Sequence, residues 1–293
     1  MSKNTSNLES ATVEGFGLEW SAYDQSGVTE TELNQVFRTY FKIFPWHLLD
    51  PSKSVGADFG CGSGRWSKFL SPYVRHLHLI DASEAALKTA KQRLHSCKNL
   101  SFHHCSIEDF RVNGDGIADP EKLDFAISLG VLHHLPDVPR ALKDIFVNLR
   151  PGAPLLLYLY YALDGRSKFY RMTWFASDQF RKLISLLPFK VRISITQILA
   201  ALIYWPLART ALALDHFNIL PLNFPLAFYR RSSFYVMKND SLDRFGTRLE
   251  KRFSRQEIEN MLTEAGFENI RFSDEAPFWC SIAYKKGSHG TNL

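Results

Sequence analysis

Short apolar runs alternate with amphipathic stretches along the middle of the chain. Five runs have the length and content of buried strands, at residues 55–59, 76–80, 100–105, 122–130 and 153–160. Helical spacing of apolar residues separates them, at residues 63–73, 83–95 and 138–149. Strands that alternate with helices predict a parallel sheet with helices on both faces.

The turn after the first strand is rich in glycine. Residues 57–64 read ADFGCGSG, and the glycines stand at 60, 62 and 64. Glycine lets the backbone approach a ligand closely, and ligands of such sheets bind beyond the carboxyl ends of the strands. Asp81, at the end of the second strand, can accept hydrogen bonds from both hydroxyls of a ribose. These residues predict a cofactor that resembles a nucleotide.

The spacing of the glycines argues against a dinucleotide. A dinucleotide fingerprint would need glycine at position 65, where the chain has Arg65. Asp58 would also place a negative charge near the phosphates. S-adenosylmethionine has an adenosine ribose, a positive charge and no phosphate, and it fits better.

The motifs carry a family resemblance. ADFGCGSG, LIDAS, CSIEDF, LDFAISLGVLHHLPD and LRPGAPLLLYLY follow in this order within residues 55–160. They resemble the motifs of class I S-adenosylmethionine-dependent methyltransferases, above all the methyltransferase-11 group with the ubiquinone and menaquinone C-methyltransferases. The resemblance implies a Rossmann-like α/β fold with a seven-stranded sheet, ordered 3-2-1-4-5-7-6, strand 7 antiparallel, and a mainly helical insertion after strand 5. Residues 267–273 and 278–286 would be strands 6 and 7, after a helix that Ser254 and Glu257 cap.

The resemblance also implies which residues hold the cofactor. The methionine part would lie among Asp58, Gly60, Cys61, Gly62 and Gly64. Asp81 would bind the ribose and Ala82 would lie beside the adenine. The adenine edge and the end of strand 4 would add Ile107, Glu108, Leu129 and Gly130. For Cys61 we expect a small filler rather than a nucleophile.

The segment at residues 15–26 has the character of a flap. Trp20 and Tyr23 could cover the cofactor, because aromatic faces attract cations. Simple packing of this arm on the domain is the alternative. Thr29 and Glu32 then cap a helix with one apolar face.

The acceptor side is less defined. In the family, acceptors enter after strand 4, where His133 and His134 stand, and we expect His134 rather than His133 as a base. The alternative is that this pair only shapes the loop. Other candidates for acceptor binding are Tyr160, Tyr161, Asp243, Arg244 and Arg248. A charged loop paired with itself is the alternative for the last three.

Four regions are expected: a flap and helix at 1–50, the cofactor-binding core at 51–160, a helical lid at 161–236, and the rest of the sheet at 237–293. The lid segment holds ten Lys and Arg against three Asp, and 15 of the 40 aromatic residues. It could form the acceptor pocket, dock on an anionic membrane, or be a solvated helical layer. We expect an exposed basic surface at Arg181, Lys182, Lys190 and Arg192, and breaks between short helices at Pro188, Pro206, Pro221 and Pro225.

Composition narrows the class. The chain is 45% hydrophobic and 22% charged, which is ordinary for a globular protein. Its four cysteines form no CxxC pair and show no metal-ligand spacing. The first ten residues lack an apolar signal core and no run reaches 18 uncharged apolar residues, so we expect a cytoplasmic protein, at most peripheral to the inner face of the membrane.

The acceptor is expected to be a small molecule, amphiphilic or anionic, such as a quinone, lipid, polyketide or saccharide intermediate. The place after strand 4 reads SLGV, without the Asn/Asp-Pro-Pro-Tyr segment of enzymes that methylate DNA bases. Nucleic acid is therefore disfavoured as a partner. A cofactor-binding sensor or assembly module without catalysis is the alternative function, and the oligomeric state is left open.

Overall fold

The computed structural model describes residues 6–111, 122–162, 168–221, 224–275 and 279–287. Within them, seven strands form one sheet in the order β3-β2-β1-β4-β5-β7-β6. The strands are β1 Val55–Phe59, β2 His76–Asp81, β3 Leu100–His104, β4 Phe125–Leu129, β5 Pro154–Tyr158, β6 Phe267–Phe272 and β7 Cys280–Lys285. β7 runs antiparallel to both of its neighbours, and the other pairs are parallel. The predicted topology is confirmed; Phe278, expected at the start of strand 7, lies outside the described residues.

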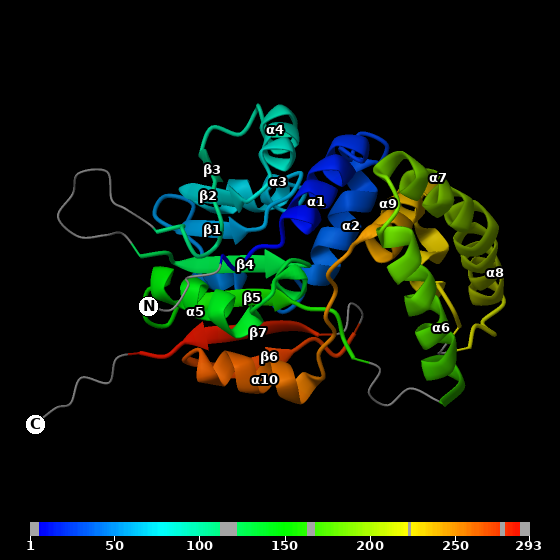
Figure 1. Cartoon of the computed structure of the whole chain (residues 1–293). Coiled ribbons are helices and arrows are strands. Elements are labelled where there is room, and N and C mark those ends of the chain that lie inside the picture. The colour runs from blue at the N-terminus through cyan, green and yellow to red at the C-terminus, as the bar shows by residue number, and fades with distance from the viewer. Residues whose placement is uncertain (1–5, 112–121, 163–167, 222–223, 276–278, 288–293) are drawn as a thin grey trace, which may run out of the picture.

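Helices cover both faces of the sheet (Figure 1). One face packs against α5 (Val138–Asn148) and α10 (Arg255–Glu264). The other packs against α2 (Glu30–Tyr40), α3 (Ser67–Leu70) and α4 (Glu84–Arg93). The predicted N-caps of α2, α4 and α10 are present, and α10 has the complete capping box.

A helical layer follows β5, and we call its helices α6 to α9 the lid. They are α6 Lys168–Ser185, α7 Phe189–Leu199, α8 Trp205–His216 and α9 Phe234–Gly246, with a π-helical turn at Ala200–Tyr204. In Figure 1, α6, α7 and α8 lie on the outer side of α9, away from the sheet. The expected boundary at residue 236 falls inside α9, so the lid extends to Gly246.

The remaining elements are short, apart from one. The 3₁₀ turns are Trp46–Leu48, Ser71–Tyr73, Leu132–His134 and Ala227–Arg231. α1 (Ser10–Ala22) lies between the core and the lid, where it contacts both α4 and α9. The N-terminal segment therefore joins the two halves of the molecule.

Pro206 does not break the lid as expected, and that prediction is wrong. α7, the π turn and α8 form one continuous helix, Phe189–His216, of 28 residues. Pro206 lies two residues after the end of the wider π turn, which takes up the local irregularity that the proline ring and its missing N–H impose. Among the described residues this is the one helix long and apolar enough to cross a membrane, and its most apolar window of 18 residues has a mean hydropathy of 1.4. The 18-residue rule applied to the sequence did not find it.

Two of the four expected surface cations face inward, and for them that prediction is wrong. Arg181 pairs with Asp178 and donates to the carbonyl oxygen of Thr247 at 2.9 Å. Arg192 donates to the carbonyl oxygen of Gly246 at 2.6 Å. Both guanidinium groups satisfy carbonyls at the end of α9, where the C-terminal helix dipole is negative. They fix the lid rather than forming a basic surface.

Candidate functional site

The glycine turn after β1 is strained for any other residue. Gly60, Gly62 and Gly64 have φ values of +77°, +53° and +69°. A Cβ atom at Gly60 would lie 2.4 Å from Val131, and one at Gly62 would lie 2.8 Å from the indole of Trp20. The bare backbone therefore serves two purposes, the left-handed turn and the close approach of covering side chains.

Two carboxylates flank this turn. Asp81 accepts hydrogen bonds from the backbone N–H groups of Gly62 at 2.9 Å and Ser83 at 2.8 Å. Burial raises the pKa of Asp81, and these two donors oppose the rise. Asp58 is buried and accepts from the Ser67 hydroxyl at 2.6 Å, and burial raises its pKa to about 7. Asp81, which was predicted to bind the ribose, therefore lies directly beside the glycine turn.

The other expected cofactor residues divide into two groups. At the end of β4, Leu129 is buried and Gly130 has a φ of +81°, with open space where a Cβ atom would stand. Burial raises the pKa of the Cys61 thiol well above its usual range, which keeps it protonated and fits a filler. Ile107 belongs to the core, and Glu108 binds the backbone N–H of Asn7 and pairs with Arg140. Ala82 accepts from the ring of His104 through its carbonyl oxygen.

α1 covers the glycine turn with only one of the two expected aromatic residues. The Trp20 indole lies against Gly62, and the guanidinium of Arg65 stands 5.4 Å from the Trp20 ring centre and 4.4 Å from that of Trp66. Tyr23 instead packs edge-on against Tyr235 of α9, with ring centres 5.3 Å apart. Its hydroxyl accepts from the Gln197 side chain at 3.3 Å. Trp20 therefore faces the glycine turn, whereas Tyr23 faces the lid.

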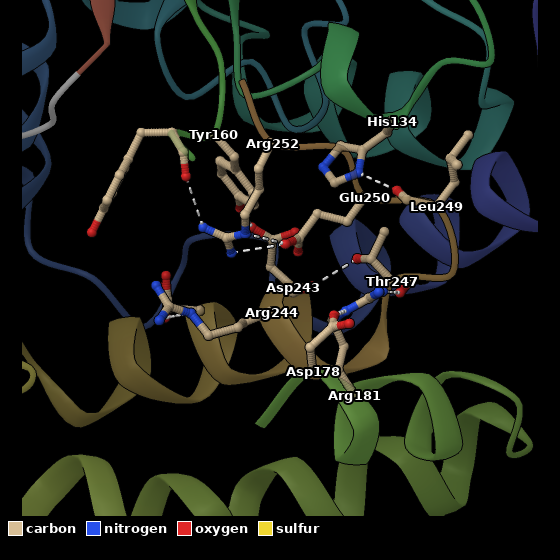
Figure 2. Close-up of polar contacts among 12 residues, drawn as sticks. His134, Tyr160, Asp178, Arg181, Asp243, Arg244, Thr247, Leu249, Glu250 and Arg252 are labelled. Atoms are coloured by element: carbon tan, nitrogen blue, oxygen red, sulfur yellow. Dashed lines mark hydrogen bonds and ion pairs between the residues drawn. The ribbon is translucent and has the colours of Figure 1, made fainter. Parts of the chain in front are cut away.

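A cluster of polar side chains lies between the core and the lid, and we call it the polar cluster (Figure 2). Its members are Glu19, His134, Tyr160, Asp240, Asp243, Arg244, Glu250 and Arg252. The Tyr160 hydroxyl donates to Asp243 at 2.6 Å, and Arg252 pairs with Glu250 at 2.7 Å. One cavity of about 30 Å³ opens beside Arg244, Glu250 and Arg252, and is large enough for a water molecule.

His134 is held in one tautomer. Its Nδ1 atom lies 2.7 Å from the carbonyl oxygen of Leu249. A carbonyl can only accept, so Nδ1 carries the proton and Nε2 keeps a lone pair. This Nε2 is buried and has no hydrogen-bond partner among the described residues. Burial lowers the pKa of His134, although nearby Asp243 raises it. The ring is therefore neutral near pH 7 and can accept a proton through Nε2.

His133 is in a different position. Its ring is completely buried and stacks on Tyr160 with ring centres 3.9 Å apart. Burial lowers its pKa well below the usual range. This geometry favours packing for His133 and leaves His134 as the stronger base.

The polar cluster is acidic. Burial raises the pKa of Glu19 well above its usual range, and Asp243 adds to the rise. Glu19 accepts from the Asn239 side chain at 2.8 Å, which ties α1 to α9. Asp243 Oδ1 and Glu250 Oε2 are buried and lack partners in the described part of the chain. The unused groups are thus mainly hydrogen-bond acceptors, which suit a ligand with hydroxyl or amino groups.

Only some of the expected acceptor-binding residues join the cluster. Tyr160 and Asp243 do, and Arg244 lies 3.8 Å from Asp240 on the same helix. Tyr161 faces Trp279, with ring centres 6.1 Å apart. Arg248 is exposed, and its Nε donates to the carbonyl oxygen of Ser185 at 3.4 Å.

Sequence reasoning missed Glu19, Asp240, Glu250 and Arg252. Asp240 could have been found, because it lies three and four residues before Asp243 and Arg244 and so shares their helix face. Glu19 stands among apolar and aromatic residues in GFGLEWSAY, which is a signal for a buried acid. Glu250 and Arg252 carry no such local signal.

A row of aromatic rings joins the polar cluster to the glycine turn. Trp66 lies 4.9 Å from Tyr40, Tyr40 lies 5.2 Å from Tyr158, and Tyr158 lies 5.9 Å from Tyr160, measured between ring centres. Arg65, which stacks on Trp66, also acts electrostatically on both Glu19 and Asp58. The two parts of the site are therefore linked through packed aromatic rings.

Part of the chain is similar in sequence and in fold to known methyltransferases. The methyltransferase domain family matches residues 57–155, which hold the glycine turn, Asp81 and both histidines. This part of the chain therefore resembles a methyltransferase domain, and the sheet has the strand order expected for the class I fold. Human N-acetylserotonin methyltransferase, solved in complex with SAM, shares the fold with a TM-score of 0.50 at 16% identity, over 93% of this chain and 57% of that one.

Two curated relatives match part of the chain. Ubiquinone biosynthesis O-methyltransferase of Aromatoleum aromaticum is 31% identical over 96 residues, which is 32% of this chain. tRNA (carboxymethyluridine(34)-5-O)-methyltransferase of Schizosaccharomyces pombe is 30% identical over 135 residues, which is 42% of this chain. The chain spans 39% and 51% of these relatives. Their acceptors differ widely, so the shared domain does not select an acceptor.

The site fits S-adenosylmethionine, the cofactor of this class. A glycine turn without side chains, a carboxylate at Asp81 and open space at Gly130 match a nucleoside with an attached amino acid. A pyrophosphate would need free backbone N–H groups in this turn, but the N–H of Gly62 already donates to Asp81, and the buried Asp58 lies close by. The domain therefore suits a nucleoside cofactor better than a dinucleotide.

Proposed function

We propose that the chain is an S-adenosylmethionine-dependent methyltransferase that acts on a small molecule with a hydroxyl or amino group. When bound, S-adenosylmethionine supplies an activated methyl group whose leaving thioether is neutral. In this proposal Asp81 holds the ribose, the turn from Asp58 to Gly64 holds the methionine part, and Trp20 covers it. Ala82, Ile107, Glu108, Leu129 and Gly130 complete the proposed cofactor site.

The observation that carries the proposal is the state of His134. Its Nε2 lone pair is buried, free of partners in the described chain, and next to the row of rings that leads to the glycine turn. A group in this state can take the proton that a hydroxyl or a protonated amine must lose. Tyr160 and Asp243 then position the acceptor, together with alignment that itself lowers the barrier.

The acidic polar cluster refines the expected acceptor. Unpaired oxygens of Asp243 and Glu250 would repel an anion close to the reacting atom, and they would attract hydrogen-bond donors. An amphiphilic acceptor fits this cluster. If the acceptor carries an anionic group, that group has to lie outside the polar cluster. Nucleic acid remains disfavoured, because the inner cluster offers few cations that are not already paired with carboxylates.

The test is transfer of a labelled methyl group. Purified protein with labelled S-adenosylmethionine is offered hydroxylated and aminated amphiphiles, and matched compounds in which these groups are already methylated. Label should enter only the unmethylated compounds. A protein that binds S-adenosylmethionine tightly but labels no compound, even in a crude lipid extract, would instead support the sensor or assembly module.

A further inference from the structure

The outer face of the lid is apolar. On α6, the exposed residues Met172, Phe175 and Leu183 recur at helical spacing, and Leu186 follows just beyond the end of the helix; Phe175 is 61% exposed. The opposite side of the same helix is buried, at Arg181, Ile184 and Ser185. α6 therefore turns several large apolar side chains outward, with the exposed Gln179 among them.

The neighbouring helix has the same division. Along Phe189–His216, the exposed residues Val191, Ile198, Leu202 and Trp205 share a face, and Leu202 is 71% exposed. The buried residues of this helix, including Thr196, Tyr204 and Ala208, lie on the opposite face. Only 22% of its most apolar window is covered by protein. Exposed apolar area of this extent marks a surface that meets something other than water.

Basic side chains border this apolar surface. Arg171, Lys182 and Lys190 are exposed on the lid and Arg231 is exposed beside it. Lys182 pairs with Asp178 and Arg231 with Asp215, but each of these acids also holds a second cation, Arg181 or Arg230, so the surface keeps a positive charge. Apolar stripes bordered by Lys and Arg are typical of helices that lie in the interface of an anionic bilayer.

We propose that the outer face of α6 to α8, which we call the docking face, binds the surface of an anionic lipid bilayer. The apolar residues enter the boundary between headgroups and acyl chains, and the four cations contact lipid phosphates. Charge decides against a second copy of the chain, because a two-fold contact would set these cations against one another.

The helix lies on the bilayer rather than crossing it. Its inner face is held by protein: Ser241 donates to the Thr196 carbonyl at 2.9 Å, and Arg209 donates to carbonyl oxygens of Arg230 and Ser232. Crossing would break these contacts and place Arg209 in hydrocarbon, which is costly. Binding at the surface keeps every one of them.

The docking face and the polar cluster share the lid. Arg181 and Arg192 bind the end of α9, and α9 carries Asp240 and Asp243. Docking therefore brings the acceptor side close to the bilayer. This last step rests on the proposed function, whereas the binding itself does not.

Sedimentation with vesicles tests the proposal. The wild-type protein should pellet with phosphatidylcholine vesicles that contain phosphatidylglycerol, and less with phosphatidylcholine alone. Added salt should weaken the binding, because it shortens the screening length. Replacing Phe175, Leu183 and Leu202 by Ser should lower the partition coefficient about tenfold or more. Lys190→Gln alone should lower it by about fivefold, the scale of one cation at an anionic surface.

A control replaces three exposed apolar residues of the core, which are somewhat less exposed than the three lid residues. Leu48, Tyr73 and Val147 are 42%, 50% and 42% exposed, and their replacement by Ser should leave partitioning unchanged. Calorimetry with S-adenosylhomocysteine shows whether each variant is folded. Wild-type protein that ignores anionic vesicles, or equal losses in both triple variants, overturns the proposal. A dimer that the lid variants dissociate, without vesicle binding, assigns the face to a second copy.

Discussion

Arg181 and Lys182 are neighbours on α6 and share Asp178 as a partner, yet they belong to different parts of the molecule. Arg181 is 9% exposed and reaches the Thr247 carbonyl, whereas Lys182 is 57% exposed and borders the docking face. One side of the lid closes the polar cluster and the other faces outward. Adjacent cations in a basic segment can therefore have different roles, because the helical period places one on the buried face and the other on the exposed face.

The same contrast holds for carboxylates and apolar groups. The inner side of the lid collects acids, Asp240 and Asp243, under a segment whose composition is strongly basic. The outer side collects leucine, isoleucine and phenylalanine that a soluble domain would normally cover. Net charge and hydropathy therefore describe the lid poorly until its two faces are separated.

The largest expected effect lies on the inner side. His134→Gln should lower the rate of methyl transfer by about 10² or more, because it removes the base while it preserves the ring volume in part. Affinity for S-adenosylmethionine and binding to anionic vesicles should stay the same. Steady-state kinetics with a labelled methyl donor provide the measurement. A rate within a few fold of wild type would leave His134 only the role of shaping the loop.

The pH profile sharpens this test. Burial lowers the pKa of His134, so the neutral base persists below its usual pKa of about 6.5, and the acid limb of kcat/KM should fall below that pH. The exposed His95 serves as the control, and His95→Gln should keep both the rate and the limb. An acid limb well above pH 6.5 in the wild type would contradict the assignment.

The next effect compares the two faces of α6 in stability. Arg181→Ala should reduce the free energy of unfolding by about 2 to 3 kcal/mol, because a nearly buried ion pair and a hydrogen bond to Thr247 are lost. Lys182→Ala should cost about 0.5 kcal/mol or less, as for exposed pairs one helical turn apart. Urea unfolding of both variants measures the difference. Equal losses would show that the faces do not differ in energy as described.

The smallest effect extends the comparison to the core. Burial raises the pKa of Asp58 to about 7, above its value in the unfolded chain of about 4. The folded state therefore holds an extra proton between these pH values, and stability is lost as pH rises through this window. Asp58→Asn removes that contribution, so the stability of this variant relative to wild type should be higher at pH 8 than at pH 6, by about 1 to 2 kcal/mol. Thermal unfolding of both proteins at both pH values, without cofactor, measures this difference. If wild type and variant change equally with pH, the raised pKa is excluded.

Much of the core could be predicted from local sequence. Each strand of the sheet is a short apolar run whose burial is favourable, and the ends of the strands fall within a few residues of the prediction. The caps at Ser83 and Ser254 are recognisable because one side chain satisfies a nearby N–H. The positions of Gly62 and Asp81 follow from the same motif.

The rest depends on contacts between distant segments. Glu19 and Asn239 are 220 residues apart, and no local pattern pairs them. The continuity of the helix through Pro206 rests on a π turn that the sequence does not announce. The inward direction of Arg181 depends on where α9 ends. These features follow from how the lid packs, which is a property of the whole fold.

Cofactor binding by Asp81 variants tests the account most directly. Titration calorimetry with S-adenosylmethionine should show binding to the wild type, and Asp81→Ala should weaken it by about 1.5 to 3 kcal/mol, the scale of hydrogen bonds to a charged group. The variant is first shown to be folded, since Asp81 also accepts from Gly62 and Ser83. NADH should bind neither protein. Unchanged affinity in a folded Asp81→Ala variant, or tight binding of NADH to the wild type, would contradict the assignment of the cofactor site.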